Sequence, residues 1–182
     1  MSMSFGETAQ TNSTEGFTVS VILKEGQLGL SWKQAGATSE FLGEVLATQS
    51  AKSGLDYSEA RHAIIYLVNE LLENAIKFSS PGDVEVRCSL EESTFELAVI
   101  NRIAPDLVSG FQGLLAELTT RDPGDLLIER IEANAADETS SASGLGILTL
   151  MNDYGVRMGW HFSDAPAGNA IVLRTHASLS LN

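Results

Sequence analysis

The chain has 182 residues and a formal net charge of −13, from 24 acidic and 11 basic side chains. That charge excludes nucleic acid and an anionic membrane surface as main partners, because both are bound by clustered lysine and arginine. Hydrophobic residues make up 43% of the chain, which is ordinary for a folded domain. No apolar run approaches the roughly 18 residues that span a bilayer, and the N-terminus lacks the pattern of a signal peptide. One cysteine, Cys88, excludes an intramolecular disulfide. We therefore expect a single cytoplasmic domain.

Hydrophobic periodicity predicts groups of strands and helices in alternation. The expected strands are 17–23 and 28–32, joined as an N-terminal β-hairpin, then 84–90 and 95–101 as a second hairpin, and finally 156–163 and 170–175. The expected helices are 38–51, 58–79, 105–137 with a break near 122–124, and 147–154. This order implies an α+β fold, a two-layer sandwich of a mixed, mostly antiparallel sheet with helices on one face.

The domain organisation follows from the same pattern. A polar, Ser- and Thr-rich N-terminus at 1–15 is expected to be flexible. Residues 16–182 are expected to form one domain, in which 16–57 hold the hairpin and first helix and 58–176 hold the core.

The helix 58–79 carries the most informative pattern. Six apolar side chains share one face of its helical wheel and should form the core face: Ile64, Leu67, Val68, Leu71, Ala75 and Phe78. Along the margin of that face runs a second stripe of four residues: Tyr66, Glu70, Asn74 and Lys77. Polar groups at such a margin lie where a cleft can open onto the core, although a plain amphipathic boundary would give the same spacing.

The literal string NELLENAIKFS at 69–79 resembles the N box of the GHKL superfamily, the ATP-binding proteins that include sensor histidine kinases, gyrase and anti-sigma-factor kinases. The resemblance implies the histidine-kinase-type ATPase fold. It also implies that Asn74 coordinates a Mg²⁺ ion that bridges nucleotide phosphates, that Glu70 is the catalytic base or water-orienting residue, and that Lys77 reaches the phosphates. Mg²⁺ suits such a site because it prefers oxygen ligands and keeps several waters.

A second element is the string SGLGILTL at 143–150, in which Gly144, Leu145 and Gly146 lead into a helix. Glycines admit an anion close to the backbone, and a helix N-terminus offers free N–H groups. By its order in the chain it resembles the superfamily's second glycine box, although a plain loop-to-helix turn remains the alternative. The string GNAIVL at 168–173 resembles the Gly-Thr motif before the last strand, so the resemblance spans about 58–175.

One motif departs from the family pattern. The superfamily places D-x-G-x-G after the second strand that follows the N box, where its Asp accepts the adenine amino group. Here Asn101 stands in the place of that Asp, and Ile103 stands in the place of the first glycine. An Asn carbonyl can still accept an amine hydrogen, but it carries no charge.

The resemblance implies a stand-alone bacterial regulator, similar to anti-sigma-factor serine/threonine kinases, that uses Mg²⁺ and ATP on a partner of the anti-anti-sigma type. Two alternatives remain open: a degenerate module that binds its partner without phosphotransfer, and a fold that binds another adenine-containing ligand such as the flavin dinucleotide FAD. A homodimer through the N-terminal hairpin also remains open. Trp32, Phe41 and Trp160 are expected to be core or interface anchors, and the acidic stretch 117–138 a mobile lid or a face for a basic partner.

Overall fold

A computed structural model of the chain describes residues 2–7, 16–25, 30–136, 144–165 and 170–181. The strands are β1 (Ser2–Gly6), β2 (Phe17–Leu23), β3 (Val84–Glu91), β4 (Thr94–Ile103), β5 (Arg157–Asp164) and β6 (Ile171–Ser180). The helices are α1 (Trp32–Lys52), α2 (Tyr57–Lys77), α3 (Pro105–Thr120), α4 (Pro123–Ala136) and α5 (Leu145–Asp153). Within these ranges, no helix combines the length and the apolar character that a bilayer crossing needs.

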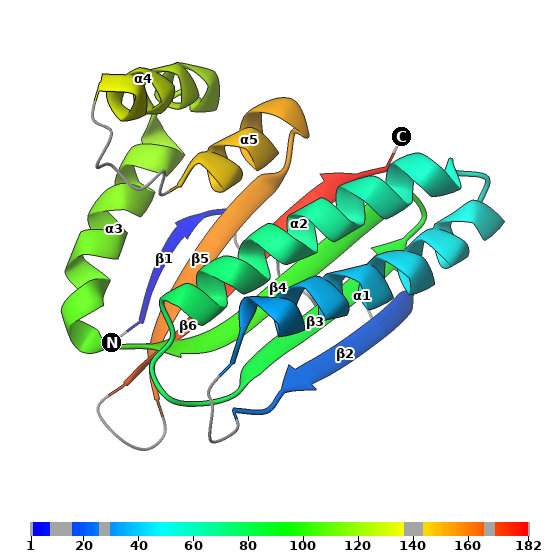
Figure 1. Cartoon of the computed structure of the whole chain (residues 1–182), viewed down its shortest axis with the longest axis horizontal. Coiled ribbons are helices and arrows are strands. Elements are labelled where there is room, and N and C mark those ends of the chain that lie inside the picture. The colour runs from blue at the N-terminus through cyan, green and yellow to red at the C-terminus, as the bar shows by residue number, and fades with distance from the viewer. Residues whose placement is uncertain (1, 8–15, 26–29, 137–143, 166–169, 182) are drawn as a thin grey trace.

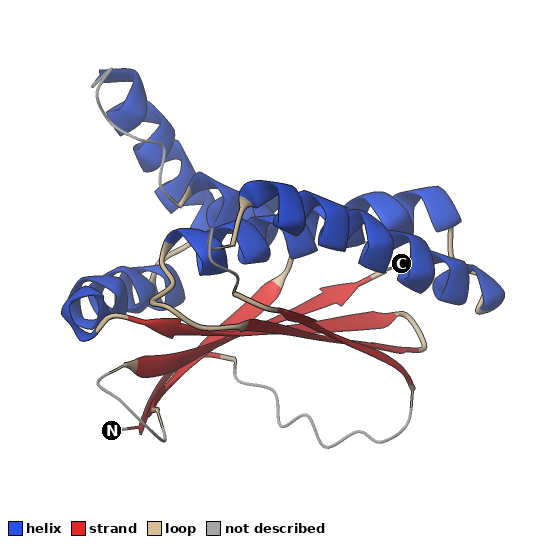
Figure 2. Cartoon of the chain, turned by 60° about the horizontal axis from the view of Figure 1, so that its bottom comes forward, coloured by secondary structure: helices blue, strands red, loops and turns tan. Residues whose placement is uncertain are grey.

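The six strands form one antiparallel sheet in the order β1-β5-β6-β4-β3-β2 (Figure 1). The helices lie on one face of this sheet, and the opposite face carries none of the described helices (Figure 2). The predicted α+β sandwich is therefore confirmed, with every strand pair antiparallel. Side chains alternate between the two faces, so that in central β4 Phe95, Leu97 and Val99 are buried beneath the helices.

Helix α2 lies over the sheet beside α1 and carries the predicted core face. It begins after Asp56, whose carboxylate accepts a hydrogen bond from the Glu59 backbone N–H at 2.8 Å. Five of the six predicted core residues are buried: Ile64, Leu67, Val68, Leu71 and Ala75. The prediction for Phe78 is wrong, because this residue follows the helix as its C-cap and is 37% exposed.

The predicted N-terminal hairpin does not form. Strand β2 is present as expected, but it pairs with β3 in the sheet. Trp32 begins helix α1, and the Gln34 side chain accepts a hydrogen bond from the Ser31 backbone N–H at 2.7 Å, which stabilises the start of the helix. Residues 28–29 of the expected second strand lie outside the described residues.

The expectation of a flexible N-terminus is wrong for Ser2–Gly6, which forms the edge strand β1. The alternation in this segment places Phe5 on the helix side, where its ring packs edge-on against Phe162 with ring centres 6.1 Å apart. Residues 8–15 lie outside the described residues.

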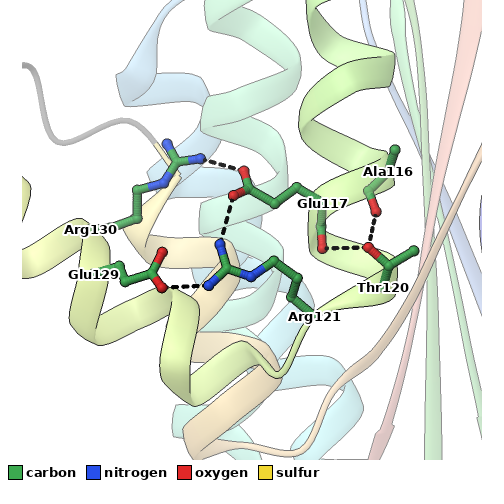
Figure 3. Close-up of polar contacts among 6 residues, drawn as sticks. All are labelled: Ala116, Glu117, Thr120, Arg121, Glu129 and Arg130. Carbon is green, nitrogen blue, oxygen red and sulfur yellow. Dashed lines mark hydrogen bonds and ion pairs between the residues drawn. The ribbon is translucent and has the colours of Figure 1, made fainter.

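Helices α3 and α4 form an angled pair whose junction is held by ion pairs (Figure 3). The Arg121 and Arg130 guanidinium groups donate to the Glu117 carboxylate at 3.1 and 3.0 Å, and Arg121 also pairs with Glu129. Asp122 accepts hydrogen bonds from two backbone N–H groups at the start of α4. The break predicted near 122–124 is therefore confirmed, and α4 packs against α5.

Candidate functional site

Two cavities meet at the ends of α2 and α5. The first has a volume of about 350 Å³ and is walled largely by apolar side chains from the core and from α3, among them Leu71, Ala75, Phe111, Ile147, Trp160 and Leu173. The second has a volume of about 570 Å³ and is lined by charged and small residues, among them Glu70, Glu73, Lys77 and Gly146. Asn74 and Gly144 line both cavities, so the two cavities adjoin one another at these residues.

The predicted stripe on α2 divides between this site and a packing contact. Glu70, Asn74 and Lys77 all line the polar cavity. Tyr66 instead stacks on Tyr154, just after α5, with ring centres 5.3 Å apart. That contact fixes α5 against α2, which positions the glycine segment opposite the stripe.

Gly146 is the point at which the glycine segment and helix α2 touch. A Cβ atom at this position would lie 1.8 Å from Glu70 Oε2, so only glycine fits against the carboxylate as it stands. Burial raises the pKa of Glu70, and the neighbouring charge of Glu73 raises it further. The carboxylate is thus a stronger base than an exposed glutamate.

Gly144 and Leu145 begin helix α5. Gly144 is the N-cap and adopts φ +93°, a left-handed conformation that favours glycine. The first turn of α5 borders both cavities, through Ile147 and Gly146, and the free backbone N–H groups of a helix N-terminus are suited to an anion. Residue 143, the first of the predicted SGLG segment, lies outside the described residues, as do 168 and 169 of the predicted Gly-Thr-like motif.

Asn101 lines the apolar cavity and is only 3% exposed. Its Nδ2 donates a hydrogen bond to the backbone carbonyl of Ala75 at 3.2 Å, which fixes the amide and leaves Oδ1 as the free acceptor. Ile103, in the place of the family's first glycine, is buried and lines the same cavity. The cavity can thus offer an acceptor without a charge.

Helix α3 supplies a wall that sequence reasoning missed. Asp106, Leu107, Gly110, Phe111 and Leu114 line the apolar cavity from this side. Their spacing along an amphipathic helix was the available signal, but only the tertiary structure shows that this face turns toward a cavity.

The oxygen donors of the polar cavity fit Mg²⁺ better than a transition metal. Among the described residues, no three His, Cys, Asp or Glu side chains form a metal-binding group. Asn74 supplies an amide oxygen, and Glu70 and Glu73 supply carboxylates whose mutual repulsion a divalent cation would relieve. Mg²⁺ needs only one or two such protein ligands beside phosphates and water.

No protein-family model matches the chain, and no curated protein matches it. The two adjoining cavities and the residues that line them define the candidate site.

Proposed function

We propose that the protein binds an adenine nucleotide with Mg²⁺ in the two adjoining cavities, and that it acts as a GHKL-type serine/threonine protein kinase or switch on a cytoplasmic partner of the anti-anti-sigma type. One observation carries this proposal: an apolar cavity with a buried acceptor adjoins a polar cavity that is lined by Glu70, Asn74 and Lys77. A nucleotide needs an apolar cavity next to a polar one, because its base is planar and largely apolar and its phosphates are charged.

Each residue has a role in this proposal. The base occupies the apolar cavity, where Asn101 Oδ1 accepts a hydrogen bond from an exocyclic amine. The phosphates lie against Lys77 and the backbone N–H groups that follow Gly144. Asn74 would hold the Mg²⁺ ion, which supplies charge neutralisation when it is bound.

Glu70 is the residue that handles the acceptor's proton. Its raised pKa suits a group that takes a proton from a serine or threonine hydroxyl. The hydroxyl oxygen bonds to the terminal phosphorus of ATP as the bond from that phosphorus to the bridging oxygen breaks, and ADP leaves. Gly146 keeps space for the Glu70 carboxylate.

A flavin dinucleotide is the second candidate ligand. The apolar cavity is bordered by the aromatic side chains of Phe78, Phe111 and Trp160, and it lacks a carboxylate at position 101. Such walls accept a larger planar ring system than adenine. Flavin absorbance in the purified protein would favour this candidate, whereas a colourless protein that binds ATP would exclude it.

Calorimetric titration with ATP tests the main proposal. We expect binding that requires Mg²⁺ and that Asn74→Ala weakens by at least about tenfold, because this variant removes the protein ligand of the ion. Asn152→Ala is the control, since Asn152 is an exposed asparagine on α5 outside both cavities. Binding that ignores chelation of Mg²⁺, or equal affinity in the two variants, would contradict the proposal.

A further inference from the structure

Three large apolar side chains stand exposed around the adjoining cavities. Trp32, the first residue of α1, is 69% exposed and lines the polar cavity. Phe78, after α2, and Leu107, in the first turn of α3, are 37% and 44% exposed and line the apolar cavity. We call these three residues the rim. They come from three segments that meet at one end of the sandwich (Figure 1).

Two lysines border the rim. The Lys33 ammonium lies 5.7 Å from the centre of the Trp32 ring, and the Lys77 ammonium lies 5.1 Å from that of Phe78. Within the described part of the chain, neither lysine forms an ion pair. Lys77 shares the polar cavity with the carboxylates of Glu70 and Glu73, whereas Lys33 lines neither cavity. Lys33 is therefore the cation that the rim presents outside the cavities.

We propose that the rim is the docking surface for the protein acceptor, and that it binds a segment with an apolar anchor and an acidic side chain next to the receiving hydroxyl. This inference rests on the proposed kinase function. A hydroxyl must reach Glu70 to be phosphorylated, and Glu70 lines the same cavity as Trp32. A partner that delivers a hydroxyl to that cavity therefore meets the rim at Trp32.

The chemistry of the rim selects the occupant. Exposed tryptophan and phenylalanine side chains are the residues that most often dominate protein interfaces, because they bury large areas at low entropic cost. Lys77 is assigned to the phosphates in the proposed function, which leaves Lys33 as the cation available to an acidic side chain of the partner.

Partner binding by single variants tests the proposal. The binding partners are the anti-anti-sigma-type proteins of the genome of origin, each purified and measured by interferometry without nucleotide. We expect Trp32→Ala to weaken binding at least about tenfold, as for an interface hot spot. Phe41→Ala is the matched control, because Phe41 lies on the same helix, is 54% exposed and lines neither cavity. It should leave binding within about twofold of the unchanged protein.

A charge variant tests the acidic part of the inference. Lys33→Glu should slow association and weaken binding, since it repels an acidic segment. Tighter binding by Lys33→Glu would mean a basic partner and would overturn this part.

Titration of the same variants with Mg²⁺ and ATP separates docking from nucleotide binding. Lys33→Glu and Phe41→Ala should both bind the nucleotide as the unchanged protein does, because neither residue lines either cavity. Loss of nucleotide affinity in Trp32→Ala would assign Trp32 to the nucleotide site and overturn the docking role. Equal partner affinity in Trp32→Ala and Phe41→Ala would also overturn the docking role. The same holds if no protein of the anti-anti-sigma type binds. If the unchanged protein bound its partner through Trp32 but never bound ATP, the kinase function would fail and the docking surface would stand.

Discussion

The surroundings of Glu70 disfavour the charged form of its carboxyl group. Its carboxylate is half-buried against Gly146 and lies near Glu73, so its pKa is raised. A carboxyl group whose pKa is higher in the folded state destabilises the fold at neutral pH, because folding must hold a charge that water would solvate better. This free-energy cost is absent below pH 4.5, the ordinary pKa of the group, because the carboxyl group is then protonated in both the folded and the unfolded state.

We therefore expect Glu70→Gln to be more stable than the unchanged protein at neutral pH. The gain in Tm should be on the order of 1–2 °C, since half exposure screens the effect, and it should vanish near pH 4. The same variant should lose phosphotransfer to a protein hydroxyl. Thermal unfolding at two pH values measures the first effect, and a Tm gain that persists at acidic pH would contradict the assigned origin.

Single residues also show where sequence reasoning succeeds and where it stops. The positions of Glu70, Asn74 and Lys77 on one helix margin followed from periodicity alone. The burial of Asn101 and its hydrogen bond to Ala75 did not, because that bond joins positions 26 residues apart on different elements. The exposure of Phe78 was missed because the helix ends one residue before it.

Among the elements, α3 is the wall that determines the size of the apolar cavity. Gly110 lies on that wall, and a Cβ atom added there would meet nothing within 4 Å. Glycine in a helix interior costs about 1 kcal/mol relative to a good helix former. The helix therefore forgoes stability at the position where a side chain would enter the cavity.

Gly110→Leu should consequently fill part of the cavity and reduce nucleotide affinity by at least about tenfold while stabilising α3 by up to about 1 kcal/mol. Gly113→Leu is the matched control, since a Cβ atom there also meets nothing within 4 Å but the residue does not line the cavity. Calorimetry and urea unfolding measure the two effects. Equal nucleotide affinity in both variants would show that the cavity is not the base site.

The elements differ in how far they could be predicted. Helix α2 and the β3–β4 hairpin rest on local periodicity and short-range pairing, so the sequence was sufficient for them. Strand β1 has five residues and pairs with a segment more than 150 residues away, as in Met3 opposite Phe162. The prediction that Trp32 lies in a strand is wrong. Aromatic residues favour strands, but the hydrogen bond between Ser31 and Gln34 begins helix α1 at Trp32.

On the scale of the whole molecule, a polar network links the strands on the sheet face opposite the helices (Figure 2). His176 pairs with Glu96, and the Ser178 hydroxyl donates to Glu96 Oε1 at 2.8 Å. Arg157 donates to Ser178 at 3.2 Å and pairs with Glu7 at 3.3 Å. These contacts join β4, β6 and β5 with the segment that follows β1, which spans the sheet from its centre to one edge.

This network predicts acid sensitivity. Burial acts to raise the pKa of Glu96, but hydrogen bonds from His176 and Ser178 outweigh it, so the pKa lies below its ordinary value of 4.5. A carboxyl group with a lowered folded-state pKa stabilises the fold above its unfolded pKa, and this contribution is lost as the pH falls through the folded value. Glu96→Gln should therefore cost about 1–3 kcal/mol at neutral pH and less near pH 4, where the loss of this contribution has begun.

Urea unfolding at the two pH values measures this difference. Glu91→Gln is the control, because Glu91 is an exposed carboxylate near the end of β3. A penalty for Glu96→Gln that stayed the same at both pH values would show that lost packing, and not charge, causes it.

The cavity between α2 and α3 has a consequence for the free energy of local opening. Where α3 faces the cavity, it lacks the neighbouring atoms that α1 and α2 find against the sheet. A bound ligand supplies those missing contacts, and it stabilises the folded wall by an amount that grows with the logarithm of its concentration. The amide hydrogens of α3 and α4 are then protected from exchange in proportion to occupancy, whereas those of α1 and α2 are protected whether or not a ligand is bound. The exchange protection of α3 and α4 thereby reports the concentration of the ligand around the protein.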